Sequence, residues 1–145
     1  MESSPREIVE KVRRMVAGES DVFADLFAVD GVLEYPFAPP GQPRELVGRE
    51  AIRRHFGQPG ANRRRLFQME GVDAVVHETT DPEVVIAEIA HHGLSRVTGR
   101  SYRFEAIGVI RVRGGEIINY RDYMDPISLA RLLGRTSDLA SALAE

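Results

Sequence analysis

Two ionisable residues, His91 and Asp122, fall on otherwise apolar faces of expected β-strands. Successive strand side chains point to opposite faces, so each strand divides into two sets of alternate residues. In residues 83–93, the odd positions from Val85 to Gly93 are all apolar or small except His91. In residues 116–124, the even set is Glu116 beside the turn, then Ile118, Tyr120, Asp122 and Met124. Burying a carboxylate is costly unless it is paired or protonated, so these two positions are candidates for acid–base chemistry.

A structural role for both residues stays open on alternation alone. Asp122 could accept a hydrogen bond from a backbone N–H or an arginine, and His91 could be a satisfied core histidine. Three other ionisable residues are weaker candidates. His77 and Asp73 share a face and could reach an internal pocket. Glu88 lies on the face opposite His91, where exposure to solvent or a subunit contact is expected.

Several other kinds of chemistry have no support in the sequence. His91 and His92 are adjacent in a strand and point apart, so they are not a metal pair. His55 stands on an expected helix and is expected at the surface. No serine has a nucleophile-elbow context, and no glycine-rich phosphate loop occurs. The chain has no cysteine, which excludes disulfides, thiolate nucleophiles and zinc–thiolate sites. We therefore expect neither a metal nor a cofactor.

The length and net charge of the chain limit the remaining classes of protein to which it can belong. The 145 residues suit one domain, 1–145, with a core of about 5–134 and a tail at 135–145. A net charge of −3 gives no general attraction to nucleic acid. No apolar run approaches the ~20 residues that span a bilayer, so no membrane association is expected. The charged N-terminal segment lacks a signal-peptide core, which predicts a cytoplasmic protein.

Helical patterns fill the first half of the chain and strand patterns the second. Ser4-Pro5 is typical of a helix start, and a second helix is expected from Ser20 or Asp21 to Gly31. A proline-rich loop spans 36–48. The remaining elements are a helix at 49–57, strands at 66–78, 83–93, 101–113 and 116–124, and a helix from Asp125-Pro126 to Gly134. This order predicts an α+β fold in which helices cover one face of an antiparallel sheet.

The inward faces of the expected strands enclose an apolar pocket. Even positions of 101–113 are all apolar, aromatic or glycine, and the odd positions of 31–37 include Leu33, Tyr35 and Phe37. A small, largely apolar metabolite is the ligand that suits such a pocket. The residues expected to bind it are Tyr35, Tyr120, Leu33, Ile89, Phe104 and Met124.

Four segments of the chain resemble a known superfamily. They read DVFADLFAVDGVLEYPFAPPG, GREAIRRHF, VTGRSYRFEAIGVIRVRGGEI and NYRDYMDP. Together they resemble the SnoaL-like branch of the nuclear-transport-factor-2-like superfamily over about residues 10–134. That branch is also similar to polyketide cyclases, ketosteroid isomerases and limonene-epoxide hydrolases. The resemblance implies a cone in which a strongly curved, mostly antiparallel sheet wraps around N-terminal helices and an internal pocket. It also implies a homodimer through the outer sheet face, where Ile107 and Val109 are apolar.

The resemblance assigns roles residue by residue. Asp122 matches the aspartate of the epoxide hydrolases' Arg-Asp-Tyr motif. Ile89 and His91 stand where those enzymes have an Arg-x-Asp pair, and Leu33 and Tyr35 stand where they have the water-binding Tyr and Asn. Hydrolysis by that mechanism is therefore not expected. Without the arginine, a pKa above the ordinary range is expected for Asp122.

The favoured function is a cofactor-independent acid–base enzyme, an isomerase or a polyketide-cyclase-like enzyme for intramolecular ring closure. Asp122 would transfer the proton, His91 would be the complementary donor, and Tyr35 and Tyr120 would donate to a developing oxyanion. The alternatives are a small-molecule binding protein of the same fold, an epoxide hydrolase with a rebuilt site, and a structural role for the dimer.

Overall fold

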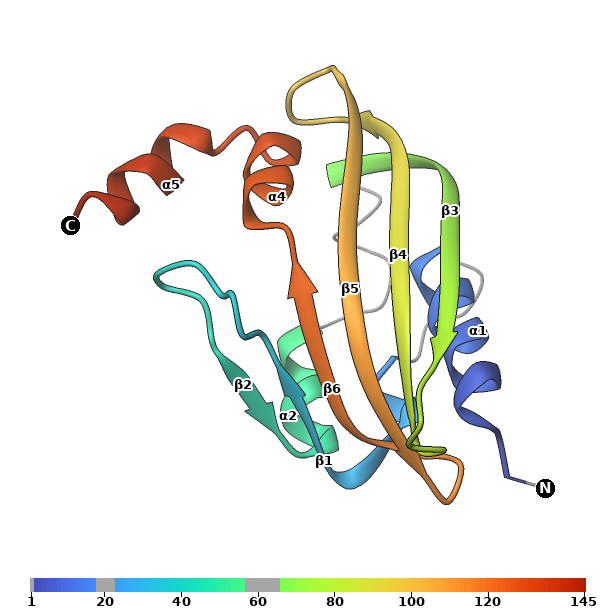
Figure 1. The fold of residues 1–145 in the computed structure, drawn as a ribbon. Helices are drawn as coiled ribbons and strands as arrows, with labels where there is room; N and C mark the ends of the chain where they lie inside the picture. The colour runs from blue at the N-terminus through green and yellow to red at the C-terminus, as the bar shows by residue number, and fades with distance from the viewer. Residues whose placement is uncertain (1, 18–22, 57–65) are drawn as a thin grey trace.

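The computed structural model describes residues 2–17, 23–56 and 66–145. In this part of the chain, four α-helices and one short 3-10 helix accompany a six-stranded sheet (Figure 1). The helices are α1 (Pro5–Val16), η1 (Ala24–Leu26), α2 (Arg49–Phe56), α4 (Pro126–Leu132) and α5 (Thr136–Leu143). The strands are β1 (Phe27–Glu34), β2 (Glu45–Val47), β3 (Phe67–Glu78), β4 (Val84–Ser95), β5 (Ser101–Arg113) and β6 (Glu116–Met124). No helix in these ranges is long and apolar enough to cross a membrane.

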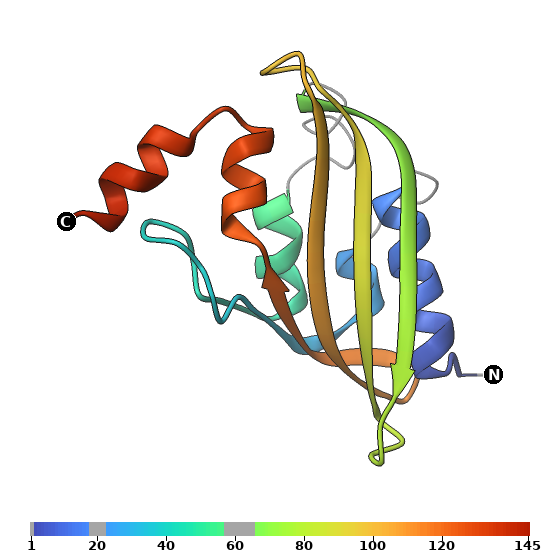
Figure 2. The same ribbon diagram turned by 45° about the horizontal axis from the view of Figure 1, so that its top comes forward.

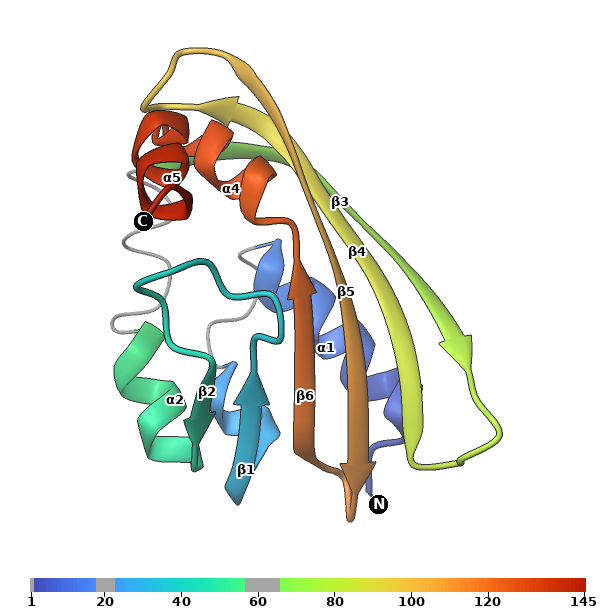
Figure 3. The same cartoon turned by 60° about the vertical axis from the view of Figure 1, so that its left-hand side comes forward.

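The sheet has the strand order β2-β1-β6-β5-β4-β3, and all neighbours are antiparallel except β1 and β6. The four long strands, β3 to β6, form the expected meander. Gly114 and Gly115 both have positive φ, 61° and 77°, as a tight hairpin turn between β5 and β6 requires. The long strands bend strongly, and α1 lies across their concave side (Figures 2 and 3). The predicted α+β cone is confirmed.

Helix α1 closes one side of the core and starts where the sequence predicts. The Ser4 hydroxyl accepts a hydrogen bond from the Glu7 N–H, and the Glu7 side chain accepts one from the Ser4 N–H. This capping box satisfies two N–H groups that the helix itself leaves without partners. Ile8, Val9 and Val12 are each 1% exposed and pack in the core cluster.

The prediction of a helix that ends at Gly31 is wrong, because the described residues from Phe23 onward form no α-helix there. Ala24–Leu26 form a single 3-10 turn, and β1 begins directly after it at Phe27. Phe27 is fully buried and joins the parallel ladder with β6. Pairing with β6 and burial at alternate positions outweigh the local helical pattern, because tertiary contacts override propensity. The expected helix start, Ser20 or Asp21, lies outside the described residues.

Two other expectations about strand positions are wrong. On β6, one extra residue at Ile118 shifts the β5–β6 register, so Ile117, and not Ile118, is the buried residue. On the segment after β1, Phe37 is 64% exposed and packs edge-on against the ring of Tyr123. In addition, the segment expected to be only loop contains the short edge strand β2. The alternation predicted for β4 and β5 is confirmed by their burial.

Candidate active site

Asp122 lies on the inner face of β6, near its carboxyl end. Its cross-strand partner on β5 is Gly108. The Oδ1 atom is buried and has no hydrogen-bond partner among the described residues. Burial raises the pKa of Asp122 from 3.8 to about 7, because the protein interior disfavours the charged form. A carboxyl group with this pKa can both accept and return a proton near neutral pH.

Two tyrosines share the electrostatic environment of Asp122. Tyr120 lies two residues earlier on the same face of β6 and is 5% exposed, and Tyr35 follows the end of β1. Burial raises the pKa of both phenols, and the charge of Asp122 raises it further. Both side chains therefore stay protonated and can serve as hydrogen-bond donors beside the carboxyl group. Their expected role as donors to an oxyanion stays a prediction.

The Tyr120 ring is held by aromatic packing and by the absence of a side chain at Gly108. Phe23 packs edge-on against Tyr120 with ring centroids 5.7 Å apart, and Phe27 stacks on it at 6.3 Å. A Cβ at Gly108 would lie only 2.9 Å from the Tyr120 hydroxyl oxygen. Leu33, which pairs with Tyr120 in the parallel ladder, is fully buried and supports it from β1.

His91 is buried in a separate aromatic cluster. Its ring stacks at 5.4 Å on Phe67 and lies 5.2 Å from the ring of Phe104. Its Nδ1 atom is 2.9 Å from the Tyr102 hydroxyl. This hydrogen bond and the packing give His91 a structural environment, and they place the predicted binding residue Phe104 in the same cluster.

The strand registers separate His91 from Asp122. His91 pairs with Phe104, whereas Asp122 pairs with Gly108, four residues further along β5. Four residues span roughly 13 Å along a strand, and two strand spacings add about 10 Å across the sheet. The expectation that His91 is the complementary donor to Asp122 is therefore not supported. The structure brings together Asp122, Tyr35 and Tyr120.

A cavity of about 160 Å³ opens beside Tyr35. Two predicted binding residues, Tyr35 and Met124, line it, whereas Ile89 belongs to the packed core. His55 and Gln42 also line it, and neither was expected there from the sequence. Among the described residues, those that line it are Tyr35, Ala38, Gln42, Pro43, His55, Met124 and Leu129. His55 is exposed on helix α2, as expected, but it lines the cavity together with residues of the segment after β1. Its sequence context carries no signal of that position.

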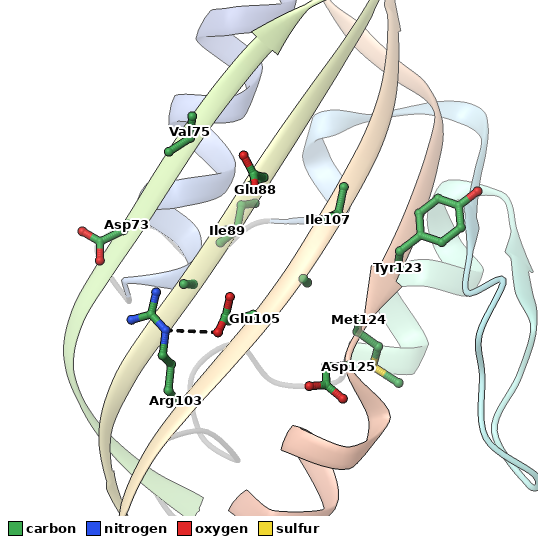
Figure 4. A pocket seen from close by; sticks show the side chains of 12 residues that line it. Asp73, Val75, Glu88, Ile89, Arg103, Glu105, Ile107, Tyr123, Met124 and Asp125 are labelled. Atoms are coloured by element: carbon green, nitrogen blue, oxygen red, sulfur yellow. Dashed lines mark hydrogen bonds and ion pairs between the residues drawn. The ribbon is translucent and has the colours of Figure 1, made fainter.

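A larger hollow of about 360 Å³ lies on the outer sheet face (Figure 4). Asp73 and Glu88 line it beside the apolar side chains of Val75 and Ile107. The His77 Nε2 atom is 2.6 Å from the Glu88 carboxylate. The expectation that Asp73 and His77 could reach the internal pocket is therefore wrong, and Glu88 lies on the outer face as expected.

Comparisons with known proteins place the chain among similar sequences and folds. A family model described as a SnoaL-like domain matches residues 8–120. An uncharacterised PhzA/B-like protein of Pseudomonas aeruginosa is 34% identical over 88% of this chain and 87% of its own. The structure of a candidate isomerase from Bacillus subtilis is 28% identical, with a TM-score of 0.76 over 90% of this chain and 93% of that one. A candidate polyketide cyclase from Pseudomonas putida, 17% identical, has the same fold, with a TM-score of 0.66 over 90% and 98% of the two chains.

Proposed function

Because the chain belongs to the SnoaL-like family, we propose that it is a cofactor-independent acid–base enzyme that acts on a small, largely apolar metabolite. The observation that carries the proposal is the carboxyl group of Asp122, with its buried Oδ1 lacking a partner among the described residues and its pKa raised to about 7. Perturbed carboxyl groups of this kind concentrate at functional sites. The likeness to a candidate isomerase of Bacillus subtilis supports the same class of reaction.

The geometry supports proton transfer at a carbon next to a carbonyl group. Asp122, in its carboxylate form, takes the proton, and the electron pair moves onto the carbonyl oxygen as an enolate. The phenols of Tyr35 and Tyr120 donate hydrogen bonds to that oxygen. In a β,γ-unsaturated ketone the anion is a dienolate, and Asp122 returns the proton to its γ carbon, which gives the conjugated isomer. In a cyclisation, the enolate carbon instead attacks a second carbonyl carbon of the same molecule, and Asp122 protonates the new alkoxide.

The test is deuterium exchange in D₂O with cyclohexanone and cyclohexane-1,4-dione as probes. We expect the protein to accelerate exchange at the carbons next to the carbonyl, and Asp122→Asn to reduce this acceleration at least about 100-fold. Asp73→Asn, on the outer face, is the matched control and should leave it unchanged. If the ketones bind without exchange, the pocket belongs to a binding protein. An Asp122 pKa near 3.8 by NMR titration would exclude the base role for any substrate.

We further propose a homodimer through the outer sheet face. Val75 and Ile107 are 53% and 44% exposed there and lie beside the outer hollow. A second copy of the chain would bury these side chains, and exposed apolar patches of this kind mark protein–protein interfaces. Light scattering should give the mass of a dimer for the native chain and of a monomer for Ile107→Glu. A monomeric native chain at micromolar concentration would exclude this interface.

A further inference from the structure

The cavity beside Tyr35 contains a polar group that the proposed proton transfer does not use. His55 lies on the last turn of α2 and forms part of the cavity wall. Its ring is 6.5 Å from the Tyr35 ring, and it packs edge-on against Phe56 at 5.1 Å. Among the described residues, it has these ring contacts but no hydrogen bond. An imidazole at a cavity wall has polar nitrogens with which it can bind a ligand.

The lining of the cavity defines what it can hold. Ala38, Pro43, Met124 and Leu129 supply apolar surface, and none of the described residues that line the cavity has a carboxylate. The cavity volume of about 160 Å³ is close to that of an engineered cavity of about 150 Å³ that takes up benzene. A six-membered carbon ring therefore matches the size and the apolar walls of this cavity. The polar groups on the wall then select substituents on that ring.

We propose that His55 is a substrate-binding residue, and that it donates a hydrogen bond to a second oxygen substituent of a six-membered-ring substrate. This inference rests on the proposed function, because it takes the reactive carbonyl oxygen of the same ring to lie against Tyr35. Asp122 does not line the cavity, but it lies close enough to Tyr35 for its charge to raise the Tyr35 pKa. The substrate class is then a cyclic ketone with two oxygen functions. One oxygen carries the charge of the enolate, and the other fixes the orientation of the ring against His55.

This binding role can be measured without turnover. Cyclohexane-1,4-dione and cyclohexanone have the same ring and differ in the second oxygen. Titration of each into the protein, followed by the NMR signals of the Met124 methyl group and the His55 ring, gives the two dissociation constants. We expect the native chain to bind the dione about five-fold more tightly, as one hydrogen bond would give. His55→Phe keeps a ring of similar size and should remove the preference, whereas His55→Gln keeps an N–H donor and should retain part of it.

The Asp122→Asn variant separates this inference from the proposed function. It should keep the preference for the dione even though it no longer catalyses deuterium exchange. If exchange fails in the native chain but the preference depends on His55, the binding role stands and the enzyme proposal does not. If His55→Phe has the same preference as the native chain, or if neither probe shifts the Met124 signal, the role of His55 is overturned.

Discussion

Asp122 stands directly opposite Gly108 in the β5–β6 ladder, and the Tyr120 side chain occupies the space that a side chain at Gly108 would need. A Cβ at this glycine would lie within 2.9 to 3.0 Å of three atoms of the Tyr120 side chain. The missing side chain therefore lets the phenol lie beside the carboxyl group. The position of the proposed oxyanion donor depends on a residue that has no functional group of its own.

Gly108→Ala should displace the Tyr120 ring. The added methyl group cannot be accommodated at 2.9 Å, and Tyr120 is also held by Phe23 and Phe27, so the core has little room to yield. We expect a loss of about 1–3 kcal/mol in the free energy of unfolding, as for other overpacked sites. Urea denaturation measures it. Equal stability, with unchanged Tyr120 ring signals in NMR spectra, would show that the packing around Gly108 is looser than the structure indicates.

Alternation along β4 and β5 predicted which face each of their residues occupies, but not how far along the sheet each residue lies relative to β6. The faces of β4 and β5 are as expected because both strands pair regularly over their whole length. The separation of His91 from Asp122 depends on two strand registers, which are fixed by turn geometry and by the bulge at Ile118. His55 was missed for a similar reason. Its place in the cavity depends on the path of the segment after β1, which has no periodic pattern.

The raised pKa of Asp122 predicts a distinctive pH dependence of stability. The folded state holds this proton up to about pH 7, whereas the unfolded chain releases it near 3.8. Between these pH values the folded state binds more protons than the unfolded chain does. The contribution of Asp122 to the free energy of unfolding is therefore fully present below pH 3.8 and is lost as pH rises through 7. The shift corresponds to about 4 kcal/mol at most. Asp122→Asn removes this loss.

Urea denaturation at several pH values between 4 and 8 tests this linkage. The native chain should lose more stability across the range than Asp122→Asn does. Other groups act in the opposite sense: the pKa of Glu83 is lowered to about 2 by hydrogen bonds from Arg113 and Arg111, so its contribution is lost as pH falls. These other groups are present in both the native chain and Asp122→Asn, so their effects cancel when the two stability curves are subtracted. Parallel stability curves would mean that Asp122 is solvated in the folded state.

Tyr35→Phe should lower turnover far more than it lowers stability. The variant keeps the ring and its packing near His55 and removes only the phenolic donor. Loss of one preorganised donor to an oxyanion reduces kcat about 100- to 1,000-fold. Deuterium exchange gives the rate and ketone titration gives the affinity, which should change little. A variant with native exchange rates would leave Tyr120 as the donor and give Tyr35 a role in binding alone.

His91→Phe should affect stability and leave proton transfer nearly intact. The phenylalanine keeps a flat ring between Phe67 and Phe104 but cannot bond the Tyr102 hydroxyl. Loss of this part-buried hydrogen bond costs about 0.5–1.5 kcal/mol, and that is the expected loss in the free energy of unfolding. Deuterium exchange should stay within about three-fold of native, since the two residues are roughly 16 Å apart by strand geometry. A 100-fold loss of exchange in a folded His91→Phe variant would restore His91 to the catalytic site, and it would require the sheet to bring the two side chains closer than their registers indicate.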